Sequence, residues 1–240
     1  MNPWLVGIAF AVTIGALIAV SARENRAALV GLAVVLGATP FLGDPLPQLS
    51  TLAARVVGGV LAAYLLRASM APARTGSDVD EDPAQRGAGI GWPAEALLAI
   101  AAWLVGVSIS ARLEVLLPTG PGVPPENALA LLTPSALGTA VGLASVVVAI
   151  VPALVDRHEL RSVIGGLILL NGVLLLRGGV AGTPGDLEQL AGVALLVALA
   201  VAGSVLVSRG ARRRAVGART AKSDGDGNRR VTGGPISRAP

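Results

Sequence analysis

Residues 157–177 read RHELRSVIGGLILLNGVLLLR, a short charged turn followed by an apolar run that contains one amide, Asn171. Arg161 and Arg177 bound the 15 residues of this run. As an α-helix the run rises about 22 Å, and it spans a hydrocarbon core of about 30 Å when both arginine side chains extend outward to the interfaces. The stretch therefore predicts a transmembrane helix with an amide at mid-depth.

The amide of Asn171 has two interpretations. It can belong to a polar path or a subunit contact, because an unpaired polar group in hydrocarbon costs several kcal/mol. It can also be a clasp between helices, worth about 0.6–2 kcal/mol, that only holds the bundle together. Gly165, Gly166 and Gly172 lie on the same helix and predict that one of its faces approaches a neighbour closely.

The remainder of the chain contains further apolar blocks. Hydrophobic residues make up 53% of its 240 residues, which excludes a soluble domain. We expect an all-α fold, a polytopic membrane helical bundle of about seven transmembrane helices. The predicted spans are about 4–20, 27–42, 49–66, 94–110, 128–155, 162–176 and 187–207. Pro134 should break or kink the fifth span near one end. Residues 67–92 are predicted to form a flexible cytoplasmic loop, and 208–240 a basic, disordered cytoplasmic tail.

The distribution of arginine predicts the orientation. The first, third and fifth loops (22–26, 67–91 and 156–161) carry two, three and two arginines, and the other loops carry one at most. The positive-inside rule then predicts an outside N-terminus and a cytoplasmic C-terminus in a multi-pass protein of the inner or plasma membrane. The first span can also be a cleaved signal peptide, but the absence of a basic start favours a retained helix. The first and last three spans are compatible with a parallel 3+1+3 repeat.

Composition excludes several functions. The chain has no cysteine and one histidine, His158 in the charged turn, so it cannot by itself hold an iron–sulfur cluster, a structural zinc or a bis-histidine haem. It contains no nucleophile–base pair or metal-ligand pattern, and we predict no catalytic residue, metal or cofactor. Aromatic residues are only 2% of the chain, so we expect no nucleic-acid partner.

Arg55 lies about a third of the way into the third predicted span. An arginine inside a bilayer costs at least about 2.5–3.5 kcal/mol and persists where it has a partner or a water path. It can tune a proton or ion route or bind a partner subunit. Alternatively, its side chain extends to the nearer interface, which its place close to the helix start permits.

One stretch resembles a known family. Arg157, Leu160, Arg161, Gly165 and the triplet 170–172 are similar to a motif of the component E subunit of hydrogenase-4 and formate-hydrogenlyase complexes. That family is related to the K subunit of complex I and the C subunit of multisubunit cation/proton antiporters. Its members usually carry a glutamate in this helix that would relay a proton.

This chain departs from the family at that glutamate, because Leu167 and Leu170 occupy the candidate places. Arg55, within Ala54–Arg55–Val56, falls where the family tends to have a lysine, and residues 44–48 resemble a string of the antiporter subunit. The resemblance implies an accessory subunit of a hydrogenase-4 or complex I-like proton-translocating oxidoreductase, with lipid and other membrane subunits as partners. The alternatives are an antiporter subunit and a stand-alone small transporter that uses Arg55 and Asn171.

Overall fold

The computed structural model describes residues 3–22, 24–42, 48–70, 92–116, 133–154, 159–182 and 184–231. Within these ranges the regular structure is entirely helical, which confirms the all-α fold class. The helices are α1 (Pro3–Ser21), α2 (Asn25–Ala38), the short 3-10 helix η1 (Thr39–Leu42), α3 (Leu49–Ser69), α4 (Trp92–Leu116), α5 (Pro134–Leu154), α6 (Glu159–Ala181) and α7 (Asp186–Val231).

Six of these helical segments in the described ranges are long and apolar enough to cross a membrane. The seventh, α5, has a shorter apolar segment, Pro134–Ile150. Most residues from Ala136 to Ala149 are buried by other helices. The chain thus has several helices that are compatible with a multi-pass membrane protein, while the membrane location and a count of seven spans stay predictions.

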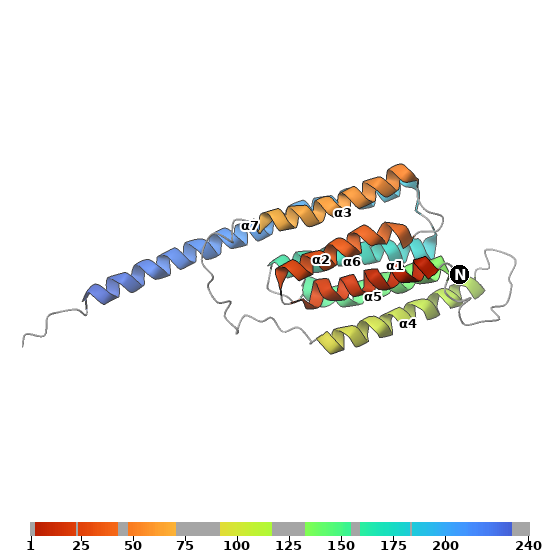
Figure 1. Ribbon diagram of the computed structural model, residues 1–240, viewed down its shortest axis with the longest axis horizontal. Coiled ribbons are helices and arrows are strands. Elements are labelled where there is room, and N and C mark those ends of the chain that lie inside the picture. Colours follow the sequence, from red (N-terminus) through yellow and green to blue (C-terminus); the bar gives the residue numbers. More distant parts are fainter. Residues whose placement is uncertain are drawn as a thin grey trace, which may run out of the picture.

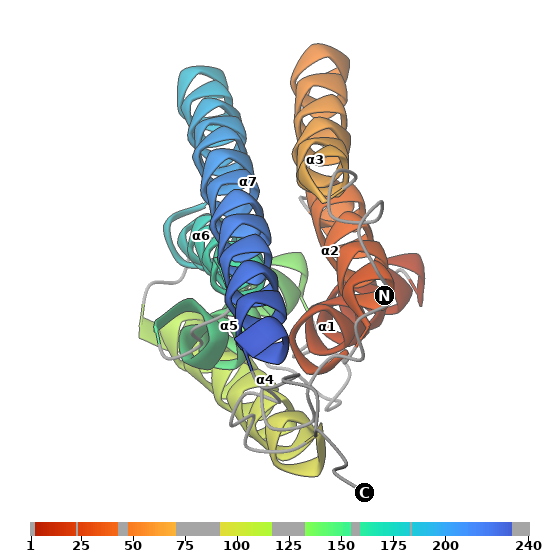
Figure 2. The same ribbon diagram turned by 90° about the vertical axis from the view of Figure 1, so that its left-hand side faces the viewer.

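The helices run along one long axis (Figure 1). Viewed from one end, α1, α2 and α3 form one row and α5, α6 and α7 the other, with α4 beside α5 (Figure 2). The rows touch helix by helix, because α1 contacts α5, α2 contacts α6 and α3 contacts α7. Since α4 is a single crossing between them, both rows run in the same order and direction, as a 3+1+3 arrangement requires.

Glycines set the distance between α5 and α6. A Cβ atom added at Gly142 would lie 2.6 Å from the backbone nitrogen of Leu176 and 2.8 Å from the carbonyl oxygen of Gly172. One added at Gly165 would lie 2.7 Å from the backbone nitrogen of Ala153. The predicted close approach is therefore confirmed for Gly165 and Gly172, whereas Gly166 meets only a side-chain tip of α7.

α5 begins at Pro134, and the predicted start of this span, 128, lies outside the described residues. Thr133 caps it: its carbonyl accepts the amide of Leu137 at 2.9 Å and its hydroxyl accepts the amide of Ala136 at 3.2 Å. Proline suits the first helical position, where its missing N–H would have no partner. Pro134 therefore starts the helix instead of kinking it, and Pro152 lies inside its last turn.

The tail prediction also needs correction. Residues 208–231 continue α7 as a helix instead of being disordered. Alanine and arginine, which are among the best helix formers, make up most of residues 211–222, so the existing helix extends through them at low cost. Residues 223–231 are rich in glycine and aspartate, and helix propensity does not explain their helical conformation. In Figure 1 this part of α7 projects beyond the other helices. Most of the predicted loop, 71–91, and the last residues, 232–240, lie outside the described residues.

Candidate functional site: a polar pocket between the two rows

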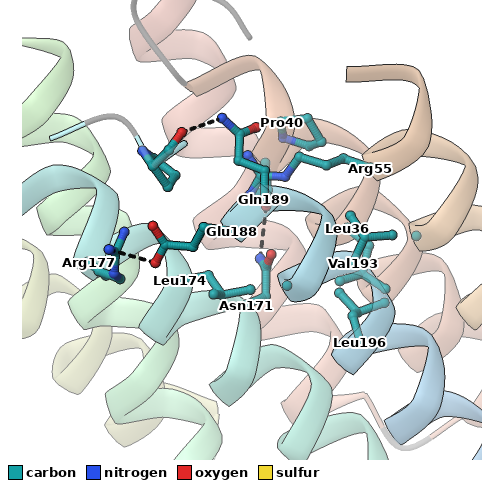
Figure 3. A pocket seen from close by; sticks show the side chains of 14 residues that line it. Leu36, Pro40, Arg55, Asn171, Leu174, Arg177, Glu188, Gln189, Val193 and Leu196 are labelled. Atoms are coloured by element: carbon teal, nitrogen blue, oxygen red, sulfur yellow. Dashed lines mark hydrogen bonds and ion pairs between the residues drawn. The ribbon is translucent and has the colours of Figure 1, made fainter. Parts of the chain in front are cut away.

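A partly open pocket lies between the rows, at the end of the bundle where α2 stops and α3 and α7 start. Its space is about 570 Å³, including the part open to the surroundings. Four helices and two connections line it, so neither row forms it alone. The lining includes Thr39 and, as labelled in Figure 3, Leu36, Arg55, Asn171, Leu174, Arg177, Glu188, Gln189, Val193 and Leu196.

Arg55 is the central charge of this pocket. It lies on α3 about 9 Å along the helix from Leu49, and its side chain runs toward Gln189 of α7 (Figure 3). The residue is half-buried, and within the described ranges its guanidinium has no hydrogen bond or ion pair. A guanidinium has five N–H donors and keeps its charge at any physiological pH, so these donors face the pocket unsatisfied.

Asn171 connects the rows at the floor of the pocket. Its Nδ2 donates to the Thr39 hydroxyl at 2.9 Å, and that hydroxyl in turn donates to the carbonyl of Val35. Both Asn171 and Thr39 are buried, at 4% and 2% exposure. The bond supports the interpretation of Asn171 as a clasp between helices, and the residue lines the pocket as well.

The rim of the pocket carries a neutralised pair. Arg177 near the end of α6 and Glu188 in the first turn of α7 form an ion pair at 2.6 Å. Both side chains are more than a third exposed, so the pair adds little stability by itself. The pair matters for the electrostatics of the pocket. Glu188 is the acidic residue of the described pocket lining, and Arg177 already compensates its charge.

Gln189 completes the polar part of the pocket. Its Nε2 donates to the carbonyl of Pro184 at 2.8 Å, which fixes the side chain, while its Oε1 is buried without a partner among the described residues. Thr51 of α3 and Asp186 of α7 approach each other nearby, with oxygens 3.4 Å apart. The Oε1 atom of Gln189 is a hydrogen-bond acceptor and Arg55 is a cation. Together they can bind a small polar or charged molecule.

Both residues that the sequence singled out, Arg55 and Asn171, line this one pocket. Sequence reasoning missed Thr39, the contribution of Gln189, and the pairing of Arg177 with Glu188. Glu188 lies in the first turn of α7, where the helix dipole by itself explains an acid, so the sequence gives no reason to single it out. Thr39 carried no signal, because a threonine in an apolar span usually bonds to its own helix.

The described part of the motif stretch, 159–177, runs along α6, so its two arginines lie near opposite ends of the bundle. At the end opposite the pocket, Arg161 donates to the carbonyl of Ala22 at 3.2 Å and so connects α6 to the first row. Leu167, one candidate place of the family glutamate, is fully buried in the apolar core. Within the described ranges no group of three or more histidine, cysteine, aspartate or glutamate residues could hold a metal ion.

Comparisons with known proteins give no identification. No family model, curated protein or solved structure matches this chain. The geometry of the pocket and the arrangement of the helices are thus the basis for a functional proposal, and the likeness of 157–177 to component E subunits stays a prediction.

Proposed function

We propose that this chain is a multi-pass membrane protein of the small-transporter class, which binds a small solute in the pocket between its two rows of helices. The observation that carries the proposal is the Arg55 guanidinium, which has no partner among the described residues, in a pocket that helices from both rows line. A buried cation is costly in a membrane, so its persistence favours a functional role. Relative movement of the rows would change access to the site.

Two features of the contact between the rows support this movement. Near the pocket two polar contacts join the rows beside the packing of α3 on α7, namely the Asn171–Thr39 hydrogen bond and the long Thr51–Asp186 contact, and both can break and re-form. Within the second row, α5 and α6 are instead joined by direct backbone approach at Gly142 and Gly172. The α5–α6 pair is thus the part of the second row that is least able to deform, while α3 and α7 pack on each other more extensively than on α2 and α6.

The absence of cysteine makes the proposal testable by labelling. In a Val193→Cys variant, the new thiol lines the pocket, and a membrane-impermeant maleimide is applied to sealed right-side-out and inside-out vesicles. A transporter should expose this thiol from both faces. Leu195→Cys, on the exposed outer side of α7, is the matched control and should react poorly in lipid.

Two results would contradict the proposal. Reaction at Val193→Cys from a single face would indicate a binding pocket without transport. An absence of reaction from both faces, with the protein folded, would show that water does not enter the pocket.

A second candidate is the accessory subunit of a hydrogenase-4 or complex I-like complex, or of a related antiporter. The observation that favours it is that the motif stretch forms α6, which packs closely on α5 and carries the polar contacts of Arg161 and Asn171. Because Leu167 is enclosed in the apolar core, this candidate is a scaffold and not a proton relay at that place. Purification of the tagged chain from its native membrane in mild detergent, with mass spectrometry, tests it. Recovery of the chain without such subunits would contradict it.

A further inference from the structure

We infer that the pocket binds a singly charged anion with an apolar body, and that Arg55 is the residue that holds its charge. This inference rests on the proposed function, because it names the ligand class of the same pocket. It follows from the charge balance, the wall composition and the position of the pocket.

The charge balance of the pocket lining indicates the sign and the number of charges on the ligand. Three ionisable side chains line the pocket, namely Arg55, Arg177 and Glu188. The last two neutralise each other at 2.6 Å, so the described lining keeps one positive charge, while the carboxylate of Asp186, which accepts from Thr51 at 3.4 Å, lies outside that lining. A guanidinium presents two parallel N–H groups, which match the two oxygens of a carboxylate or a phosphate diester. One uncompensated charge fits one carboxylate or one phosphodiester better than a dianion.

The walls define the rest of the ligand. The aliphatic part of the wall is formed by Leu36, Leu174, Val193 and Leu196. A purely inorganic ion would leave this apolar surface exposed to water. Gln189 lies at the tip of Arg55, and its unpaired Oε1 can accept one guanidinium N–H while the others remain free for the ligand (Figure 3). The site thus combines one oriented cation with an apolar surface.

The same chemistry occurs in two sources. A short-chain carboxylate from the aqueous phase and the phosphodiester headgroup of an anionic lipid are both monoanions with an apolar body. The pocket lies near one end of the helices, within about 15 Å of it at Asn171, so either source can reach it.

The electrostatic part is tested by reaction rates in detergent, where both faces are accessible. The Val193→Cys variant is treated with an anionic and with a cationic methanethiosulfonate reagent, each rate being normalised to that of a free thiol. Arg55 should favour the anionic reagent. Arg55→Gln in the same background should lower the anionic-to-cationic ratio by about tenfold, because it removes one nearby charge in a weakly screened site. Arg67→Gln, an exposed arginine at the other end of α3, should leave the ratio unchanged.

The outcomes separate the two proposals. If Val193→Cys reacts but shows no anionic preference, or a preference that survives Arg55→Gln, the anion inference is overturned while the accessible pocket stands. If Val193→Cys does not react at all, the proposed function fails first. Arg55→Lys keeps the charge and should retain most of the preference, which guards against a loss caused by misfolding.

The source is identified by protection of the same thiol. Hexanoate added to the protein in phosphatidylcholine nanodiscs should slow labelling if the ligand is a soluble carboxylate. Slower labelling in phosphatidylglycerol nanodiscs than in phosphatidylcholine ones, without hexanoate, indicates a lipid headgroup. Either protection should disappear in Arg55→Gln and persist in Arg67→Gln. Absence of protection in both arms overturns the inference.

Discussion

At the scale of single residues, the pocket shows how a bundle accommodates polar groups in an apolar setting. Asn171 is satisfied by Thr39 and Arg177 by Glu188, whereas Arg55 and one oxygen of Gln189 have no partner in the described ranges. Because an unpaired polar group costs free energy in a low-dielectric setting, the satisfied groups are best explained by stability and the unsatisfied ones by binding.

The hydrogen bond between Asn171 and Thr39 should contribute measurably to stability. We expect Asn171→Leu and Thr39→Val each to lower the free energy of unfolding by about 0.6–2 kcal/mol, the usual range for hydrogen bonds between membrane helices. The measurement is unfolding in mixed micelles as the fraction of denaturing detergent rises. The double variant should cost less than the sum of the single ones, because both remove the same bond. Strict additivity would contradict the clasp.

Most of these contacts between residues could not be predicted from the sequence. Arg55 and Asn171 could be singled out because charged and amide side chains are rare inside apolar spans. Their common pocket could not, since they are 116 positions apart in the chain (171 minus 55) and no local pattern connects α3 to α6. Thr39 has the same hydroxyl as any helix threonine, and only tertiary packing places Asn171 against it.

At the scale of elements, α5 and α6 form the central pair of the molecule. Small residues at Gly142, Gly165 and Gly172 let the two backbones approach, and α5 is buried nearly all around from Ala136 to Ala149. Without a hydrophobic driving force between helices in lipid, such close packing supplies much of the association energy. This pair gives the second row a rigid unit.

A methyl group at Gly142 should disrupt this pair. Its Cβ would lie 2.6 Å and 2.8 Å from backbone atoms of α6, so the helices would have to separate. We expect Gly142→Ala to destabilise the protein by about 1–3 kcal/mol, the usual cost of overpacking, in the same micelle titration. Gly37→Ala is the matched control, because nothing lies within 4 Å of its added Cβ and alanine is the better helix former. Equal effects at both positions would contradict the packing.

The positions of helices were readable from hydropathy, but their ends were not. The third span begins at Leu49 as predicted, since the prolines before it prevent a helix. The predicted start of the fifth, 128, lies outside the described residues, and α5 begins at Pro134, because proline can start a helix as well as interrupt one. The last helix passes the end of its apolar part, because helix propensity and not hydropathy decides where a helix in water stops.

At the scale of the whole molecule, the arrangement of two rows brings α3 and α7 side by side although they are far apart in the chain. A Cβ at Gly58 would lie 4.0 Å from the Cβ of Val193, within the range of disulfides. We expect Gly58→Cys/Val193→Cys to form a disulfide within one chain on mild oxidation, seen as a faster gel band that reductant abolishes.

The control for this disulfide uses the neighbouring position on α3. Val57 is exposed on the outer side of the helix, so Val57→Cys/Val193→Cys should stay reduced under the same conditions. A disulfide in the control, or cross-linking only between chains, would contradict the contact between the rows.

The orientation of the molecule follows from its arginines and stays a prediction. In spheroplasts, Gln48→Cys should react with an impermeant maleimide from outside, because it precedes α3 at the end of the bundle with few arginines. Ser223→Cys in the basic tail should react only after the membrane is opened. The reverse pattern would place the pocket on the cytoplasmic side.

The sequence by itself determined that this chain is a bundle of apolar helices, because hydropathy and helix period are local properties of a segment. It also singled out Arg55 and Asn171, since polar residues stand out against apolar neighbours. Only the tertiary structure decided that the helices form two rows, that α5 is enclosed, and that four helices join Arg55 and Asn171 in one pocket. The physical reason is that all apolar helices look alike to lipid, so their partners are chosen by close contacts such as Gly142 with Gly172 and Asn171 with Thr39.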